Sequence, residues 1–463
     1  MLGKIKGFVV ALLIGQLWSL TAMAQWEPQS AFSREDIIKT SEEVLAMPNI
    51  PLDIEEDILR INVLRMDWDV GGMVYRPKDA SQIPVGPDGK KVGVFVIHGG
   101  GSDYRSKDDV ARFLASKFGF KVVVMSFPGT IYLLDPSRNW PGDTFKADGS
   151  LRMPIWNKDK PITKDQYEVV EDKSMRPKYG TMTLACAKEG SEFYNRMSGW
   201  PLSFEETGKA LMARHFPDDE YSIYIHGHST GGPFAFMFTQ RVENIVGVLG
   251  METSPFGSIY RVQSRPSGHP QGKTRADLPF NCLHVYKWHI AAMYIGAEAL
   301  MLEGPEALMR LPMLMEEVYE AWEKRKTYPQ FKYESPVHFG GRAQLARAAR
   351  ATAKRLDLSS YEAEKLEKHY VGYVDALRGS GVKPVPSIIF GMTSASAGHE
   401  YKTYQRITLP MYAGMDPAPK VRLVTFDAGV HGYTKAQTDL PMGPFPVVAK
   451  LWYEAIMEGY YTD

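Results

Sequence analysis

The segment GHSTG at residues 227–231 has the residue types that a nucleophilic serine requires. It lies between an apolar run that predicts a strand (YSIYIH, residues 221–226) and an apolar stretch that predicts a helix. A serine on a sharp strand-to-helix turn needs small residues two positions to either side, and Gly227 and Gly231 meet that need. The helix N-terminus would add positive potential where an oxyanion develops. The sequence therefore predicts that Ser229 is a nucleophile.

A second glycine-rich segment, HGGG at residues 98–101, follows another predicted strand with the sequence VGVFVI. Successive glycines allow several backbone N–H groups to point at one oxygen, and a tetrahedral intermediate needs such donors. We expect the amides of Gly99 and Gly100, together with that of Thr230, to form an oxyanion hole. His98 is predicted to have a structural role.

The order of strand-HGGG, then strand-GHSTG-helix, then a late histidine resembles the α/β-hydrolase fold superfamily, particularly its carboxylesterase-like members. The resemblance covers most of the chain by element order. In this family the catalytic residues follow the order serine, acid, histidine, so the histidine should come after the last core strand. His431 follows the last predicted strand, residues 421–426, in a loop of small residues. The resemblance thus implies that His431 is the general base for Ser229.

The sequence offers several carboxylates for the acid of this triad. The family commonly places it in the loop after the strand SIIF, but the sequence GMTSASAGHE there has no carboxylate before Glu400. Some members carry the acid at the end of the strand after the nucleophile helix, where IVGVLG leads to Glu252. A carboxylate that closes an apolar strand needs a partner, and the imidazolium of His431 would be one; a salt bridge to an insertion is the non-catalytic alternative. We predict Glu252 as the acid and keep Glu400, Asp427 and Asp416 as alternatives.

Short apolar runs alternate with helical patterns along the chain, which predicts an α/β-hydrolase fold with a mostly parallel central sheet flanked by helices. The predicted strands are 92–97, 121–125, 221–226, 245–250, 387–390 and 421–426, and the predicted helices are 107–118, 204–215, 231–241 and 447–458. Alternating residues from 57 to 77 predict an antiparallel hairpin around Gly71-Gly72. Two tracts, about 127–199 and 253–384, do not fit this alternation. We expect them to be insertions at the carboxyl edge of the sheet, the second forming a large, mainly helical cap.

The N-terminal residues 1–24 have the pattern of a secretory signal peptide. Lys4 and Lys6 precede an apolar run, and residues 21–24 (TAMA) offer the small residues of a cleavage site. An uncleaved anchor is the alternative, but the run is shorter than the ~20 residues that a membrane span needs. We therefore expect residues 25–463 to be exported, periplasmic or secreted, without a stable membrane span.

Composition and cysteine content narrow the class of protein further. The net charge is +0, which argues against a general nucleic-acid binder. Cys186 and Cys282 are the two cysteines, and they predict either one disulfide in an oxidising compartment or two buried thiols. His226 and His228 are better explained by the turn at Ser229 than by a metal pair, so no metal or cofactor is expected.

These features together predict an exported serine hydrolase that cleaves a carboxylic ester through an acyl-enzyme. Amidase or peptidase activity is one alternative, because it uses the same triad. A non-catalytic binding protein on the same fold is another, although binding alone would not require a nucleophile, oxyanion glycines and a histidine together. The expected substrate is a small-molecule or polymer-derived ester, held in a site that the insertions help to form.

Overall fold

The computed structural model describes fifteen parts of the chain. These are residues 30–99, 109–132, 151, 153–172, 182–228, 231–253, 282–284, 346, 349–350, 353–354, 356–377, 383–393, 409–413, 415–427 and 444–462. The predicted signal peptide and most of the second predicted insertion lie outside these residues. Among the helices within them, none is both long enough and apolar enough to cross a membrane.

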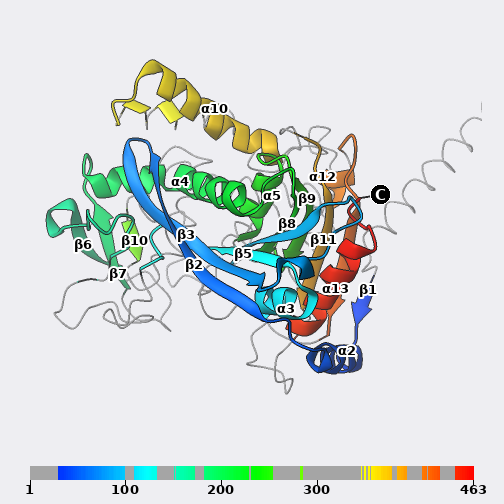
Figure 1. Cartoon of the computed structure of the whole chain (residues 1–463). Helices are drawn as coiled ribbons and strands as arrows, with labels where there is room; N and C mark the ends of the chain where they lie inside the picture. The colour runs from blue at the N-terminus through cyan, green and yellow to red at the C-terminus, as the bar shows by residue number, and fades with distance from the viewer. Residues whose placement is uncertain are drawn as a thin grey trace, which may run out of the picture.

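A nine-stranded sheet forms the centre of the described structure, in the order β1-β12-β11-β9-β8-β4-β5-β3-β2 (Figure 1). Its strands are β1 (Ser30–Phe32), β2 (Leu52–Val63), β3 (Met66–Pro77), β4 (Lys91–Ile97), β5 (Lys121–Met125), β8 (Tyr221–His228), β9 (Ile245–Met251), β11 (Ser387–Thr393) and β12 (Val421–Phe426). The pairs from β1 across to β5 are all parallel, and β3 runs antiparallel to both β5 and β2. The predicted mostly parallel sheet is therefore confirmed.

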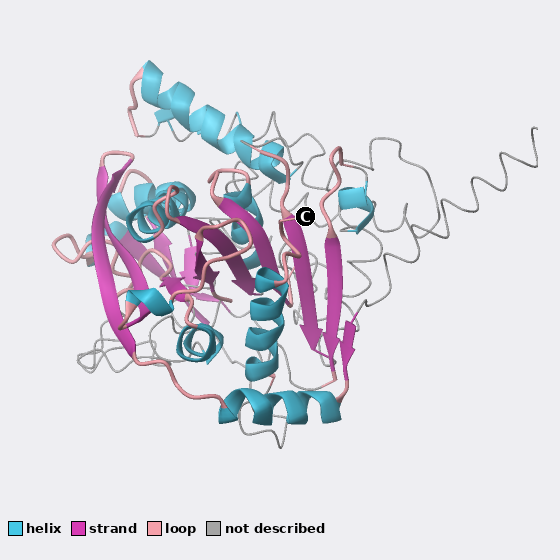
Figure 2. Ribbon diagram, turned by 45° about the vertical axis from the view of Figure 1, so that its right-hand side comes forward, coloured by secondary structure: helices cyan, strands magenta, loops and turns pink. Residues whose placement is uncertain are grey.

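Helices cover both faces of this sheet (Figure 2). On one face lie α2 (Arg34–Ala46), α3 (Asp109–Phe118) and α13 (Phe445–Met457); on the other lie α4 (Glu192–His215) and α5 (Gly232–Thr239), with α10 (Ser360–Leu377) packed against α5. Alternate strand residues face opposite cores, so Phe95 packs on the α4–α5 side while Val94 and Val96 pack on the α13 side. Three short helices are η1 (Ala80–Gln82), η3 (Lys164–Gln166) and α12 (Leu409–Ala413).

The predicted hairpin exists, but the prediction placed its turn wrongly. The chain reverses at Leu64 and Arg65, which have φ values of 51° and 61°. A two-residue hairpin turn of type I′ needs positive φ at both central residues, and Asn-Gly usually signals it, so this turn has no sequence signal. Gly71 and Gly72 lie inside β3 instead. A methyl group at Gly71 would overlap the carbonyl oxygen of Asp57 on β2, and one at Gly72 would overlap the backbone of β5. These glycines allow close strand contact rather than a turn.

The turn of the hairpin also fixes the start of α10. Arg65 Nη1 donates to the carbonyl oxygen of Asp357 at 2.9 Å, and its guanidinium forms an ion pair with Glu362. Ser359 caps the helix, because its hydroxyl accepts from the Glu362 backbone N–H while its own N–H donates to the Glu362 carboxylate. α10, which belongs to the second predicted insertion, is thus attached to the hairpin of β2 and β3.

A small antiparallel sheet joins the two predicted insertions. It has the order β10-β7-β6, with β6 (Tyr167–Asp172) and β7 (Met182–Ala187) from the first and β10 (Cys282–His284) from the second. Cys186 is disulfide-bonded, and the residue paired with it across β7 and β10 is Cys282, the only other cysteine of the chain. The structure therefore has the disulfide rather than two free thiols.

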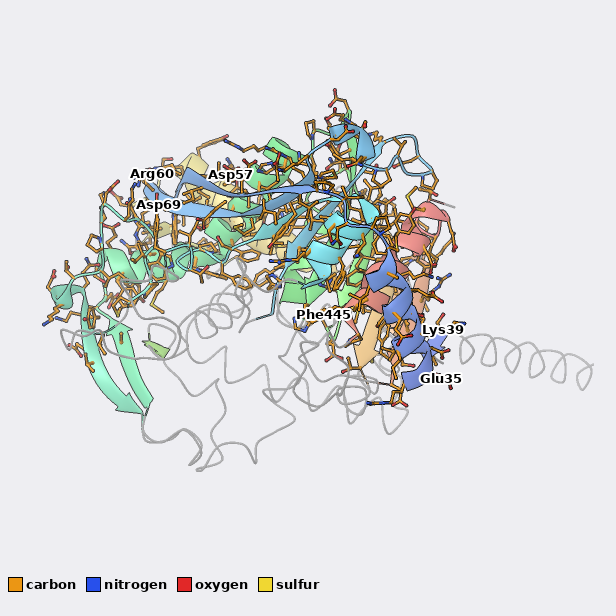
Figure 3. The ribbon with its side chains drawn as sticks, turned by 60° about the horizontal axis from the view of Figure 1, so that its bottom comes forward. Glu35, Lys39, Asp57, Arg60, Asp69 and Phe445 are labelled. Atoms are coloured by element: carbon orange, nitrogen blue, oxygen red, sulfur yellow. The ribbon has the colours of Figure 1, made fainter. Side chains whose placement is uncertain are left out.

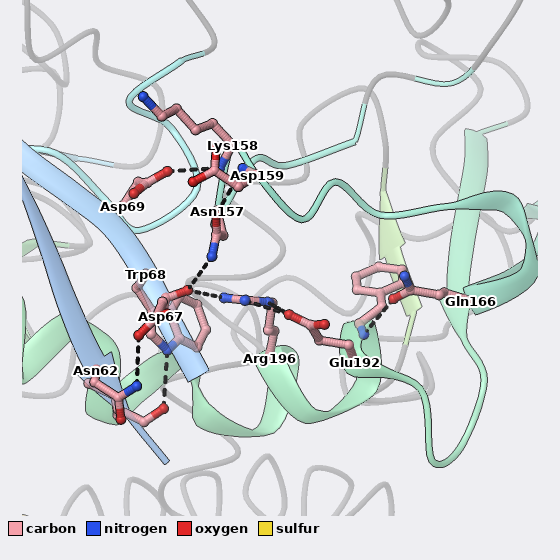
Figure 4. A network of polar contacts seen from close by, with 12 residues as sticks. Asn62, Asp67, Trp68, Asp69, Asn157, Lys158, Asp159, Gln166, Glu192 and Arg196 are labelled. Carbon is pink, nitrogen blue, oxygen red and sulfur yellow. Dashed lines mark hydrogen bonds and ion pairs between the residues drawn. The ribbon is translucent and has the colours of Figure 1, made fainter. Parts of the chain in front are cut away.

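A buried carboxylate fastens the loop at residues 156–159 to β3 (Figure 4). Asp69 Oδ1 accepts from Arg60 Nε at 2.8 Å, and Asp69 Oδ2 accepts from the Lys158 backbone N–H at 2.8 Å. Figure 3 shows Arg60 beside Asp69 on the hairpin. Burial alone would raise the pKa of Asp69, but the hydrogen bonds from Arg60 and Lys158 outweigh it and hold that pKa below its ordinary value.

Asp69→Asn is expected to lower the free energy of unfolding by about 1.5–3 kcal/mol at pH 7, because hydrogen bonds to a charged group contribute about that much. Since the folded-state pKa of Asp69 is depressed, its ionised form stabilises the fold above the ordinary carboxyl pKa. This contribution is lost as the pH falls through the folded-state pKa. The difference between variant and wild type should therefore shrink below about pH 4. Urea unfolding of the variant and the wild type at pH 7 and below about pH 4 measures this difference. Equal free energies of unfolding at pH 7 would contradict the prediction.

Candidate active site

The predicted nucleophile and oxyanion segments follow neighbouring strands at a reversal of strand order. From β4 the chain continues to β5 on one side and later to β8 on the other, so β4 and β8 form a topological switch point. In open α/β sheets, ligands bind beyond the carboxyl ends of the strands at such a point. Ile97 at the end of β4 pairs with Gly227 of β8. The HGGG and GHSTG segments therefore begin side by side.

Close packing between β8 and α5 explains the two glycines of GHSTG. A methyl group at Gly227 would lie 2.8 Å from Cβ of Ala235 in α5. A methyl group at Gly231 would overlap the carbonyl oxygen of Ile97 and lie 2.5 Å from that of His98. The start of α5 thus presses against both its own preceding strand and the end of β4. This is the requirement for small residues on which the sequence prediction relied.

Glu252 lies at the same edge, at the end of the next strand. His228, the residue before Ser229, pairs with Met251, so Glu252 is one residue beyond this pair on β9. The neighbouring Thr253 packs against the first residue of α5, because a methyl group at Gly232 would overlap its side chain. The end of β9 is therefore in direct contact with the first residue of α5.

The carboxylate of Glu252 is buried and held by β11. Glu252 is 1% exposed. Its Oε1 accepts from the Thr393 backbone N–H at 2.6 Å and from the Thr393 hydroxyl at 2.6 Å. The backbone N–H of Glu252 donates to the carbonyl oxygen of Gly391 at 2.8 Å. Its φ is 52°, which is unusual for a residue other than glycine and typical of functional sites. Thr393 was not predicted, because a threonine at the end of a strand gives no sequence signal for such a contact.

The alternative acids lie elsewhere. Asp427 is exposed and follows β12, which lies two strands beyond β9 in the sheet. Its backbone N–H donates to the carbonyl oxygen of Phe32 in β1. Asp416 is exposed and precedes β12, at the opposite end of the strands from Glu252. Glu400 lies outside the described residues. The structure describes three of these four carboxylates, and of these three only Glu252 is buried.

Three described histidines lie near the serine segment, His98, His226 and His228, and all three are buried. His226 Nδ1 lies 2.9 Å from the carbonyl oxygen of Leu249, and its ring packs 4.6 Å from that of Trp452 in α13. His98 is 8% exposed at the end of β4, beside Gly99. Packing therefore accounts for the position of His226. The predicted site residues Gly100, Ser229, Thr230 and His431 lie outside the described residues, and their roles stay predictions.

No protein-family model and no curated protein matches this chain. Among solved structures, the chain is similar to the Francisella virulence factor BioJ, with 12% identity over 91% of this chain and 89% of that chain and a TM-score of 0.36. It is also similar to a lipase in an open form, with 12% identity over 89% of this chain and 100% of that chain and a TM-score of 0.38. A third is a hormone-sensitive lipase from a metagenome library, with 9% identity over 95% and 97% of the two chains and a TM-score of 0.33.

The class of fold follows from the sheet itself rather than from these distant likenesses. Its strands are mostly parallel, helices cover both faces, and the sequence GHSTG connects a buried strand to a buried helix at the switch point. This arrangement is an α/β-hydrolase fold.

Proposed function

We propose that this protein is a serine hydrolase that cleaves a carboxylic ester with a triad of Ser229, His431 and Glu252. One observation carries the proposal. Three adjacent strands, β4, β8 and β9, lead at one edge of the sheet into HGGG, into the serine segment and into a buried glutamate. A protein that only bound a ligand would not require an HGGG segment, a serine segment and a buried glutamate at adjacent strand ends.

In the proposed mechanism, His431 takes the proton of Ser229 as the serine oxygen attacks the ester carbonyl. The backbone amides of Gly99, Gly100 and Thr230 stabilise the oxyanion, and Glu252 stabilises the imidazolium of His431. The leaving alcohol receives a proton from that imidazolium. Water then attacks the acyl-enzyme with the same histidine as base, which releases the acid and regenerates the serine.

We also infer that the protein is exported after cleavage of residues 1–24. The disulfide at Cys186 supports this, because disulfides persist in oxidising compartments and are rare in the cytosol. An α/β-hydrolase with a cross-strand disulfide between two insertions fits an extracytoplasmic enzyme.

A fluorophosphonate probe tests the proposed function, because it reacts covalently with activated serines. The folded protein should be labelled on the peptide that contains Ser229, and protein unfolded in urea should not. Mass mapping of the same sample should give Gln25 as the first residue. A folded protein without label, or with label on another residue, would reject the proposal. Matched ester and amide substrates then distinguish an esterase from an amidase or peptidase.

A further inference from the structure

Thr393 is the last residue of β11, the strand next to β9, and it contacts Glu252 twice. Its backbone N–H and its hydroxyl both donate to Glu252 Oε1 at 2.6 Å. Thr393 is 0% exposed and Glu252 is 1% exposed. Hydrogen bonds to an ionised carboxylate are shorter and stronger than neutral ones. The distance from the Thr393 hydroxyl is in the range for such bonds, and the distance from its N–H is shorter than is usual for an N–H donor.

The position of both donors is fixed by the fold. The N–H of Thr393 belongs to a strand whose preceding residues pair with β9 and β12. Its side chain is branched at Cβ, so few χ1 rotamers are open to it in a packed strand. The main chain of Glu252 is held by the same strand through Gly391. The end of β11 therefore determines both the backbone and the carboxylate position of Glu252.

Two donors on one oxygen have a chemical consequence for the carboxylate. Hydrogen bonds to the charged form favour ionisation, which opposes the effect of burial. They also restrict rotation about the terminal side-chain torsion, which is broad for glutamate in the absence of such contacts. A buried glutamate held in this way keeps one orientation.

We propose that Thr393 is a positioning residue of the catalytic site. It binds Glu252 through Oε1 and so fixes the orientation of the carboxylate that the proposed triad assigns as the acid. The inference rests on the proposed function, because it assigns the support of the acid in that triad. Thr393 touches neither the substrate nor the reacting atoms.

Thr393→Val tests this role, because it replaces the hydroxyl with a methyl group and keeps the branched shape and the backbone N–H. We expect kcat for an ester to fall about tenfold to a hundredfold, as loss of a hydrogen bond to a charged group implies, with KM unchanged. Thr393→Ser restores the hydroxyl and should recover most of the rate. If the valine variant does not fold, Thr393→Ala gives the same comparison without the added methyl group.

A double-mutant cycle separates positioning from a general structural effect. In a Glu252→Gln background, Thr393→Val should change kcat less than threefold, because the charge that it supports is already absent. The matched control is Thr207→Val in α4, a buried threonine whose hydroxyl donates to the Ser203 carbonyl oxygen at 2.6 Å. It should leave kcat unchanged.

The proposal is overturned if Thr393→Val keeps the wild-type kcat, or if its loss multiplies in full with that of Glu252→Gln. Both results would leave an active wild-type enzyme that labels at Ser229. Failure of the proposed function looks different, because the folded wild type would then neither label nor turn over esters.

Discussion

Ser229→Ala is expected to lower kcat toward an activated ester by about 10⁶-fold and to abolish fluorophosphonate labelling. The reason is that the acyl-enzyme cannot form without the serine oxygen. The remaining rate should still exceed the uncatalysed one by about 10³–10⁴-fold, because the oxyanion donors of the HGGG segment are unchanged. Steady-state hydrolysis of a nitrophenyl ester, with thermal unfolding to confirm the fold, measures this loss.

The same strand offers a matched control for this experiment. Ser222 lies near the start of β8, at the opposite end of the strand from Ser229, and its hydroxyl donates to Asp88 Oδ2 at 2.5 Å. Ser222→Ala removes a serine hydroxyl from β8 without touching the proposed site, so kcat should stay within about threefold of wild type while stability falls by about 1 kcal/mol. A Ser229→Ala protein that kept more than about a hundredth of the wild-type rate would place the nucleophile elsewhere.

The core strands could be predicted because each is a continuous apolar run. Strands buried on both faces have apolar side chains on both faces, so the signal is local and its ends are sharp. β5 and β12 match the predicted residues 121–125 and 421–426, and β4 begins one residue before the predicted 92.

Elements whose form depends on distant contacts were predicted less well. α4 begins at Glu192, although the helix was predicted only from residue 204. The helix continues through Gly199-Trp200-Pro201, residues that disfavour helix locally. Trp200 is buried here and its Nε1 donates to the carbonyl oxygen of Pro128. Tertiary packing therefore outweighs the local propensity, and the sequence pattern does not contain that information.

The candidate site also combines a feature with a local sequence signal and a feature that depends on distant contacts. The predicted turn at Ser229 depends on five consecutive residues, GHSTG, and on the apolar runs that flank them. The support of Glu252 depends on the pairing of β9 with β11, and Thr393 is 141 residues away in the chain. A threonine at the end of a strand has no sequence signal for such a role. The contact exists because β11 pairs with β9.

The second large effect is expected for Glu252→Gln, which should lower kcat by about 10⁴-fold with little change in stability. Glutamine keeps an oxygen that can accept both hydrogen bonds from Thr393, so the packing at the end of β9 is retained. It removes the negative charge that stabilises the imidazolium, and its amide can hold His431 in the wrong tautomer. The kinetic loss should therefore appear in a protein that unfolds at nearly the wild-type temperature.

Glu400→Gln and Asp427→Asn are the matched controls, because each makes the same chemical change at an alternative acid. Both should keep kcat within about threefold of wild type, because the proposed triad contains neither carboxylate. A large loss for Glu400→Gln with a small loss for Glu252→Gln would assign the acid to the segment after β11. In that case the buried Glu252 would serve to join β9 to β11, and Thr393 would be its structural partner only. Comparing the three variants therefore decides between catalysis and packing for the same pair of hydrogen bonds.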